Sequence, residues 1–312
     1  MKKDKYKCLV LMSGGLDSML SAKILKEAGL DVAPLCFKSY FFGCESAEKA
    51  CKQIGMKLRV VDFGKEHLKM LKDPKHGRGK AINPCIDCHL LMIKEAGKIM
   101  KKEKYDFIAT GEVLGQRPMS QNFQSLSVID KGSGLAGLVV RPLSLKVLPP
   151  TVLEKKGIVK RDDFYGISGR GRHEQIALAK KFGIKDYPSP AGGCILTDKN
   201  YAINLKKLFE IKPKADGNDC LILRQGRVFF NDNMVIVVAR NQNECSELSK
   251  LGKKGDIVLE PHNFAGPTVL IRKYKKSSQD EMIDCGISYV CDFSKDVPDD
   301  FILKLLPSPE SL

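Results

Sequence analysis

The sequence predicts an α/β fold with a Rossmann-like parallel sheet, followed by a smaller, strand-rich C-terminal domain. Three observations predict this. Short β-rich runs alternate with amphipathic stretches through the first 145 residues, a Gly-rich turn directly follows the first run, and strand-like runs dominate beyond residue 199. Because parallel strands need crossover helices, the alternation indicates a parallel sheet covered on both faces.

Each element of the first part follows from its local pattern. Strands are expected at residues 8–12, 32–37, 58–63, 107–110 and 138–141. Helices are expected at residues 17–28, 47–54, 87–100 and 173–182. Residues 64–84 are polar, basic and punctuated by Gly and Pro, so we expect a long insertion there. Residues 188–197 are expected to be extended.

The remaining elements define the domain organisation. A helix is expected at 201–209, with strands at 220–223, 227–230, 234–239, 256–259 and 268–272. The change of pattern predicts a first domain at 1–198, a small domain at 199–276 and a tail at 277–312. The tail carries eight acidic residues against two lysines, so we expect it to be only partly ordered.

Composition excludes several classes of protein. Of 312 residues, 43% are apolar and 29% charged, which excludes collagen, coiled-coil rods and wholesale disorder. No apolar run reaches the roughly 18 residues of a membrane helix. The N-terminal segment lacks the cleavage site of a signal peptide, which predicts a cytoplasmic protein. Eleven irregularly spaced cysteines do not indicate a secreted disulfide framework, so some thiols are candidates for chemistry.

The positive charge is confined to one part of the chain. Residues 1–200 carry 36 Lys and Arg against 21 Asp and Glu, whereas residues 201–312 carry 16 of each. Such an excess is expected if the first part faces a polyanion such as a nucleic acid. A solvated, lysine-rich surface is the alternative. Within residues 1–200, the segment 155–172 is the best candidate patch for phosphate contacts.

The hexapeptide Ser13-Gly14-Gly15-Leu16-Asp17-Ser18 follows the first strand and opens the first helix. Its glycines let backbone N–H groups face a ligand, and the helix N-terminus attracts negative charge. Ser13 and Ser18 offer hydroxyl groups to phosphate oxygens, and Asp17 offers a carboxylate to Mg²⁺. The loop lacks the lysine of a Walker loop. A Gly-rich turn with an Asp or Ser N-cap is the structural alternative.

Three cysteines stand out by their context. Cys85 and Cys88 form the only CxxC of the sequence, in NPCIDCH, at the start of a predicted helix. Two such thiols can hold one metal ion or cluster, or act as a redox pair. Cys194 follows two glycines whose backbone freedom suits an active-site loop. For each, a structural thiol is the alternative, and we expect His89 to be structural rather than a ligand.

The hexapeptide resembles the PP-loop of ATP pyrophosphatases, which cleave ATP between the α and β phosphates. Together with NPCIDCH, ATGEVLGQRPMSQ, VVRPLS and PSPAGGCILTD, in this order, it resembles the tRNA thiolation branch of the PP-loop superfamily. A CxxC with a later single cysteine is similar to thiouridylases of archaeal type, which hold an iron–sulfur cluster on three cysteines. The segments LRQGRVF, VIVVARNQNE and FAGPTVLIR resemble a small RNA-binding domain of the NFACT-R type.

This resemblance implies an ATP- and Mg²⁺-dependent tRNA sulfurtransferase with the adenine nucleotide alpha hydrolase type of fold. Its nucleotide site would consist of Ser13, Gly14, Gly15, Asp17, Ser18, Phe37, Thr110, Gly111, Gln116 and Arg141. Asp17, Cys85 and Cys194 would be catalytic. Cys85, Cys88 and Cys194 would ligate a [4Fe–4S] cluster whose fourth iron is open to sulfide. A persulfide and resolving pair of Cys85 and Cys194 is the alternative, but the cluster also explains Cys88.

Several points stay open at this stage. We expect neither the THUMP domain of the usual 4-thiouridine synthetases nor a rhodanese-like domain, so the sulfur donor is either free sulfide or a persulfide carrier. The product is 4-thiouridine or 2-thiouridine, and a homodimer is compatible with the sequence. One rival function is a small-molecule PP-loop enzyme of the deazapurine nitrile or amide synthesis type, with zinc at the CxxC. Another is a nonenzymatic RNA-binding protein with a relic loop.

Overall fold

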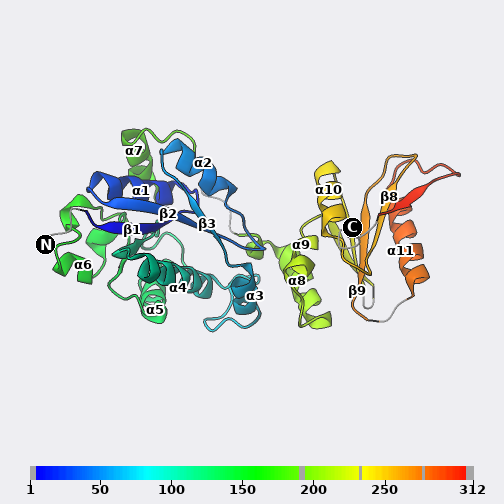
Figure 1. The fold of residues 1–312 in the computed structure, drawn as a ribbon, viewed down its shortest axis with the longest axis horizontal. Coiled ribbons are helices and arrows are strands. Elements are labelled where there is room, and N and C mark those ends of the chain that lie inside the picture. The colour runs from blue at the N-terminus through cyan, green and yellow to red at the C-terminus, as the bar shows by residue number, and fades with distance from the viewer. Residues whose placement is uncertain (1–4, 190–193, 232–233, 276–277, 307–312) are drawn as a thin grey trace. The chain divides into compact units, whose positions relative to one another are not determined.

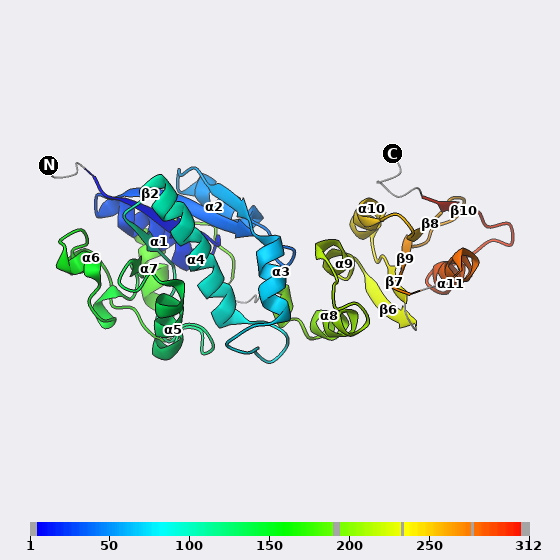
Figure 2. The same ribbon diagram turned by 60° about the horizontal axis from the view of Figure 1, so that its bottom comes forward.

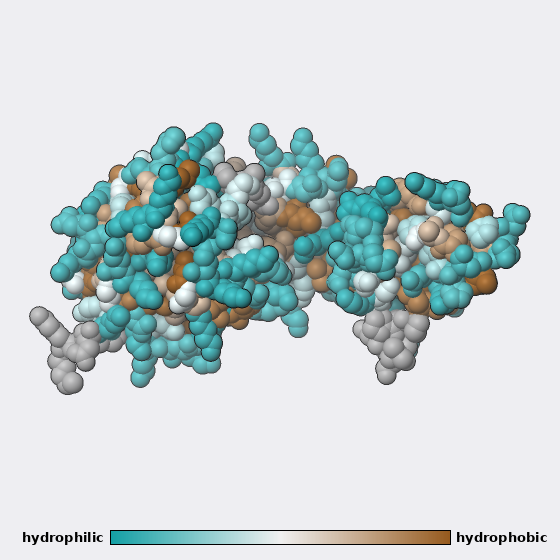
Figure 3. Space-filling view, turned by 90° about the horizontal axis from the view of Figure 1, so that it is seen from above, coloured by the Kyte–Doolittle hydropathy of each residue, from teal (hydrophilic) through white to brown (hydrophobic). Residues whose placement is uncertain are grey.

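The chain folds into two compact units, Met1–Thr197 and Asp198–Leu312, and each is described by itself. The structure, a computed structural model, describes residues 5–189, 194–231, 234–275 and 278–306. Within these residues, no helix is both long and apolar enough to cross a bilayer. The face of the molecule drawn in Figure 3 is mostly hydrophilic.

The N-terminal unit is built on a five-stranded sheet in the order β3-β2-β1-β4-β5 (Figure 1). All neighbouring strands are parallel, which confirms the predicted Rossmann-like class. In chain order the strands are β1 (Lys7–Leu11), β2 (Asp31–Lys38), β3 (Arg59–Asp62), β4 (Phe107–Ala109) and β5 (Val139–Val140).

Helices cover both faces of this sheet because alternate strand residues point to opposite sides (Figures 1 and 2). Cys8 and Val10 of β1 join the core on one face, and Leu9 joins the core on the other. The first face is covered by α1 (Leu16–Glu27), α2 (Glu45–Gln53) and α7 (His173–Lys181). The second is covered by α4 (Cys85–Glu103) and α5 (Phe123–Ser133). The loops after the parallel strands meet at one edge.

Some of the expected irregular regions are ordered. The segment expected as a long insertion begins with α3 (Gly64–Lys72), which buries His67, Leu68 and Leu71. Its lysine-rich outer face hides this apolar spacing in the sequence. Short turns of helix lie at Val152–Lys155, Leu145–Val147, Arg161–Asp163 and, where extended chain was expected, Ile195–Thr197. The preceding residues 190–193 lie outside the described residues.

The C-terminal unit contains an antiparallel sheet in the order β10-β8-β9-β7-β6. Its strands are β6 (Arg227–Asn231), β7 (Met234–Val238), β8 (Ile257–Pro261), β9 (Val269–Lys273) and β10 (Leu303–Leu305). Its helices are α8 (Lys199–Ile211), α9 (Gly217–Ile222), α10 (Gln242–Leu251) and α11 (Gln279–Asp292).

Two expectations for this unit are corrected. The strand expected at 220–223 falls in α9, whose start is fixed by a capping box between Asp216 and Asp219. The expected acidic tail contributes α11 and β10: α11 buries Met282 and Val290 against the sheet, and β10 pairs with β8. The acidic residues of α11 occupy its outer face, so net charge is a poor guide to order in an amphipathic helix.

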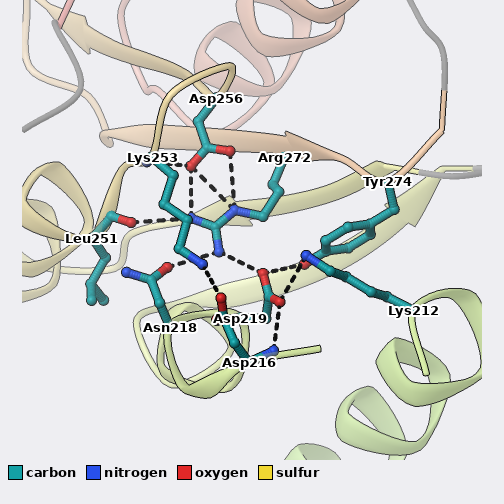
Figure 4. Close-up of polar contacts among 9 residues, drawn as sticks. All are labelled: Lys212, Asp216, Asn218, Asp219, Leu251, Lys253, Asp256, Arg272 and Tyr274. Carbon is teal, nitrogen blue, oxygen red and sulfur yellow. Dashed lines mark hydrogen bonds and ion pairs between the residues drawn. The ribbon is translucent and has the colours of Figure 1, made fainter. Parts of the chain in front are cut away.

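A buried ion cluster fastens α9 to this sheet (Figure 4). The Arg272 guanidinium on β9 is 3% exposed and lies 2.8 Å from the Asp219 carboxylate and 2.7 Å from Asp256. Lys212 and the Tyr274 hydroxyl also contact Asp219, at 3.0 and 3.2 Å. Burial alone would lower the pKa of Arg272, but these carboxylates raise it, so the cluster is charged in the folded protein.

Replacing Arg272 by Met should destabilise the C-terminal unit by about 3–5 kcal/mol, because two carboxylates lose a buried cation. Hydrogen exchange of the β7 and β9 amides in the full chain measures this. Arg240→Met is the matched control, since Arg240 pairs with Glu244 at the surface and should contribute at most about 1 kcal/mol. Equal loss of protection in both variants would contradict the role given to the cluster.

Candidate active site

The loop between β1 and α1 is tightly wound against α2. Gly14 has a φ of +84°, and a Cβ atom there would lie 2.3 Å from the carbonyl carbon of Ser46. Only glycine satisfies both the left-handed backbone and this contact. The Ser18 hydroxyl donates to the Gly15 carbonyl at 2.7 Å, and the Gly15 N–H donates to Ser13 Oγ at 3.3 Å. The predicted loop residues are therefore held together in one turn.

The turn after β4 packs directly on this loop. A Cβ atom at Gly111 would lie 2.6 Å from the Ser18 nitrogen and 2.8 Å from the Asp17 carbonyl carbon. A side chain at Gly111 would therefore push the two turns apart. Thr110, which is 3% exposed, donates its hydroxyl to Glu112 at 3.0 Å. The structure thus brings the two Gly-containing turns together at one sheet edge.

The Asp17 carboxylate is half-buried and only partly satisfied. Its Oδ2 accepts from Gln116 Nε2 at 3.1 Å, whereas its Oδ1 is buried and finds no hydrogen-bond partner in the described part of the chain. Burial raises the pKa of Asp17, and the Gln116 amide and the charges of Arg172 and Arg117 offset only part of this rise. A buried carboxylate oxygen of this kind suits Mg²⁺, which prefers oxygen ligands.

Next to this turn, Glu112 is the centre of a buried charge network. Its carboxylate lies 2.9 Å from Arg141 Nε and 2.7 Å from His89 Nδ1. The guanidinium of Arg141 also forks onto Asp130, with contacts of 2.8 and 2.9 Å. Burial would raise the pKa of Glu112, but Arg141, His89 and Thr110 together lower it to about 2. Glu112 is therefore ionised at any physiological pH.

The three singled-out thiols lie in one neighbourhood. The Ile82 N–H donates to the Leu196 carbonyl at 3.3 Å, which joins the segment of Cys194 to the segment that leads into the CxxC. Burial raises the pKa of the Cys88 thiol, and Cys194 and Cys85 raise it further by their proximity. The Asn83 amide donates to Cys85 Sγ at 3.2 Å. Two segments about 110 residues apart in sequence thus converge.

This neighbourhood is not a preformed metal site. Among the described residues, no three His, Cys, Asp or Glu side chains are arranged to hold a metal ion. Three thiols are nevertheless the donor set that an iron–sulfur cluster uses. His89, the residue after Cys88, contacts Glu112 at 2.7 Å, and because Glu112 is ionised, the Nδ1–H of His89 donates to its carboxylate.

Each of the two units contains a segment that matches a known protein family. Residues 4–147 match the family model of the thiamine biosynthesis protein ThiI, and residues 226–302 match the NFACT protein RNA binding domain. The first match lies within the N-terminal unit. The second match begins at β6 and extends through α11, so most of the residues expected as a tail fall within it.

Curated relatives are similar to this chain over part of their length. A tRNA-specific 2-thiouridylase MnmA of Buchnera aphidicola is 25% identical over 74% of this chain and 63% of its own. Another MnmA, of Sulfurimonas denitrificans, is 38% identical over 35% of each chain. A "probable tRNA sulfurtransferase" of Thermococcus kodakarensis is 28% identical over 44% of this chain and 36% of its own. In these matches the chain spans less than two thirds of each relative.

Two predicted nucleotide contacts, Phe37 and Arg141, have other partners in the N-terminal unit. The Phe37 side chain is 4% exposed, and its ring centre lies 4.9 Å from that of Phe63, so it is a core residue with almost no surface for a base. Arg141 is 3% exposed, and its guanidinium is bound by Glu112 and Asp130. Both side chains are therefore engaged within the fold, and their contact with a nucleotide stays a prediction.

The sequence alone placed the turn Thr110-Gly111-Glu112 at this edge of the sheet, but it gave no role in the site to the side chains of Glu112, Arg172 or Gln175. Glu112 lies inside the quoted segment ATGEVLGQ, and a carboxylate between two Gly-containing turns was the available signal. Arg172 was assigned to a surface patch because basic residues surround it in sequence. Gln175 carried no signal, since a single amide in an amphipathic helix has no characteristic spacing.

Replacing Glu112 by Gln should destabilise the protein by about 3–5 kcal/mol at neutral pH, because Arg141 loses a buried counter-charge. The folded pKa of about 2 lies below the ordinary value of 4.5, so this stabilisation is complete above about pH 4.5 and is lost as pH falls toward 2. Urea unfolding at several pH values should show the difference shrinking over that window. The matched control is Glu103→Gln, whose surface pair with Arg59 contributes little. A pH-independent difference would contradict the network.

Proposed function

We propose that this protein is an ATP-dependent tRNA thiolation enzyme that adenylates a uridine carbonyl oxygen and then replaces that oxygen by sulfur. The proposal is carried by one observation. Cys85, Cys88 and Cys194 lie together, and His89, one residue from Cys88, contacts Glu112, whose neighbour Gly111 packs on the Asp17–Ser18 backbone. The thiols are therefore linked to the Gly-rich loop through His89, Glu112 and Gly111.

The glycine turns support a nucleotide at the loop. Because Gly14 and Gly111 have no side chains, the backbone of the loop can pack closely against α2 and against the turn after β4. Ser13 and Ser18 add hydroxyl groups at the start of α1, where the helix N-terminus favours anions. Asp17 would hold Mg²⁺ through its unpartnered Oδ1, and that ion would neutralise charge on the β and γ phosphates.

Adenylation converts the uridine carbonyl oxygen, which is a poor leaving group, into part of a good one. The uridine carbonyl oxygen attacks the α-phosphorus, the bond between that phosphorus and the bridging α–β oxygen breaks, and pyrophosphate leaves. The base oxygen is then part of a phosphate ester, which is a good leaving group. A sulfur nucleophile adds to the ring carbon, and AMP departs with the former carbonyl oxygen. Gln116, bonded to Asp17, would orient the carboxylate during the first step.

Sulfur delivery is the role we assign to the three cysteines. We favour a [4Fe–4S] cluster held by Cys85, Cys88 and Cys194, which when bound would supply an iron site for sulfide. The raised pKa of Cys88 means that its thiol is neutral until a cation compensates the thiolate, as a cluster would. In the alternative, a Cys85 persulfide adds to the base, and Cys194 breaks the S–S bond to leave the thiocarbonyl and a disulfide.

The RNA substrate is supported by both units. The NFACT RNA-binding match covers most of the C-terminal sheet. In the N-terminal unit, Lys155, Lys156, Lys160 and Arg170 are exposed, as phosphate contacts require. Arg161 is engaged by Glu154 at 2.5 Å and is less available. We therefore assign tRNA binding to the exposed part of residues 155–170 and to the C-terminal domain.

Asp17→Asn should abolish tRNA-dependent pyrophosphate release while leaving the affinity for tRNA within about twofold, because a neutral amide cannot hold Mg²⁺ but leaves the basic surface intact. Pyrophosphate release and tRNA filter binding measure the two effects. Asp106→Asn, at the opposite end of β4, is the control. Full pyrophosphate release by Asp17→Asn would contradict the role of the loop.

Anaerobically purified protein should be brown and contain about four irons per chain if the cluster is present. Cys85→Ala, Cys88→Ala and Cys194→Ala should each remove the colour, the iron and the thiouridine detected by mass spectrometry of tRNA nucleosides. Cys245→Ala, in the C-terminal unit, should change none of these. A colourless, active preparation in which Cys88→Ala still thiolates would contradict the cluster and favour the persulfide pair.

A further inference from the structure

A second group of polar side chains faces the Asp17 carboxylate from a distant segment. Residues 168–175 run beside the turn after β4: Leu114 and Ser168 form a parallel β-bridge, and the Gly169 N–H donates to the Leu114 carbonyl at 2.7 Å. Gln116, two residues beyond Leu114, contacts Asp17. The segment that carries Arg172 and Gln175 is thereby fastened next to the PP-loop.

This group contains buried polar atoms without partners. Gln175 is fully buried in the first turn of α7, and its amide lies close enough to Asp17 to lower the pKa of that carboxyl group, but neither its Oε1 nor its Nε2 completes a hydrogen bond within the described residues. The same is true of Arg172 Nε and Asp17 Oδ1. Buried polar atoms are costly to leave unsatisfied, and natural proteins contain few of them. Several at one place indicate a ligand that supplies the missing partners.

Charge identifies the class of ligand. The loop has no lysine of the Walker type, yet a bound triphosphate needs positive charge close to its phosphates. Arg172 and Arg117 both act on the Asp17 carboxylate, so they lie near the loop. A guanidinium binds two phosphate oxygens at once, and a glutamine amide can donate to a third.

We propose that Arg172 and Gln175 form the second wall of the nucleotide site and bind the β and γ phosphates, the group that leaves as pyrophosphate. Arg172 thus takes the place of the lysine that the loop lacks, with Arg117 as an outer cation. This assignment rests on the proposed function and moves Arg172 out of the RNA-binding patch, whereas Arg170, two residues earlier, is exposed and stays in it.

Binding to the full-length protein, measured by titration calorimetry without tRNA, tests the assignment. Arg172→Gln should weaken binding of Mg-ATP and of Mg-pyrophosphate by about tenfold to a hundredfold, because charge-assisted hydrogen bonds to phosphate are lost. Binding of AMP, which lacks both terminal phosphates, should change little. Arg172→Lys should recover part of the affinity, and Arg170→Gln is the matched control for general electrostatic attraction.

Gln175→Leu separates a binding role from a packing role. Leucine removes the unsatisfied amide, so the unliganded protein should melt at the same or a higher temperature, while the rise in melting temperature produced by Mg-pyrophosphate should shrink. A lower melting temperature with an undiminished rise would overturn the role of Gln175.

The outcomes distinguish this proposal from the proposed function. Unchanged affinity of Arg172→Gln for Mg-pyrophosphate, or an equal loss in Arg170→Gln, would overturn the assignment of Arg172 and leave the thiolation proposal standing. Failure of the wild-type protein to bind Mg-ATP would overturn both. Loss of Mg-ATP and Mg-pyrophosphate binding with retained AMP binding is the result that the assignment requires.

Discussion

The close approach of two turns at the sheet edge determines the rest of this site. Gly111 leaves no room for a side chain because the backbone of Asp17 and Ser18 lies against it. That contact fixes where β4 ends relative to the start of α1, and it carries the next residue, Glu112, into reach of α4. The Gly-rich loop after β1 and the thiol-bearing helix α4 are therefore placed by one packing constraint.

Buried charge then makes the arrangement specific. Glu112 is shared by Arg141 and His89, which come from different elements, so each partner restricts the others. Taking such charges out of water is costly, and networks of this kind are retained where they fix a geometry. The C-terminal unit repeats the principle around Arg272, where ion pairs fasten α9 to the sheet. In each unit, the buried charge network fixes the position of neighbouring elements more specifically than apolar packing alone would.

Much of this fold could be predicted from the sequence, because strand and helix periodicity is local. Cys8–Leu11 and the helix after Gly15 need only neighbouring residues to be recognised. The α3, α9 and α11 helices were missed or misassigned because lysines, β-branched residues or acids masked their apolar faces. The thiols and the loop were found from motifs, whereas Arg172 and Gln175 become visible only when a distant segment is placed beside Leu114.

The central claim is that the nucleotide loop and the thiols act in turn on the same uridine. The most direct test is a single turnover of Cys194→Ala with tRNA and ATP radiolabelled at the α-phosphate. The account predicts release of pyrophosphate and accumulation of the label on tRNA, because the base is adenylated and sulfur cannot displace AMP. Wild-type protein should instead yield thiolated tRNA and free AMP. Pyrophosphate release in the variant without any label on tRNA would contradict the account.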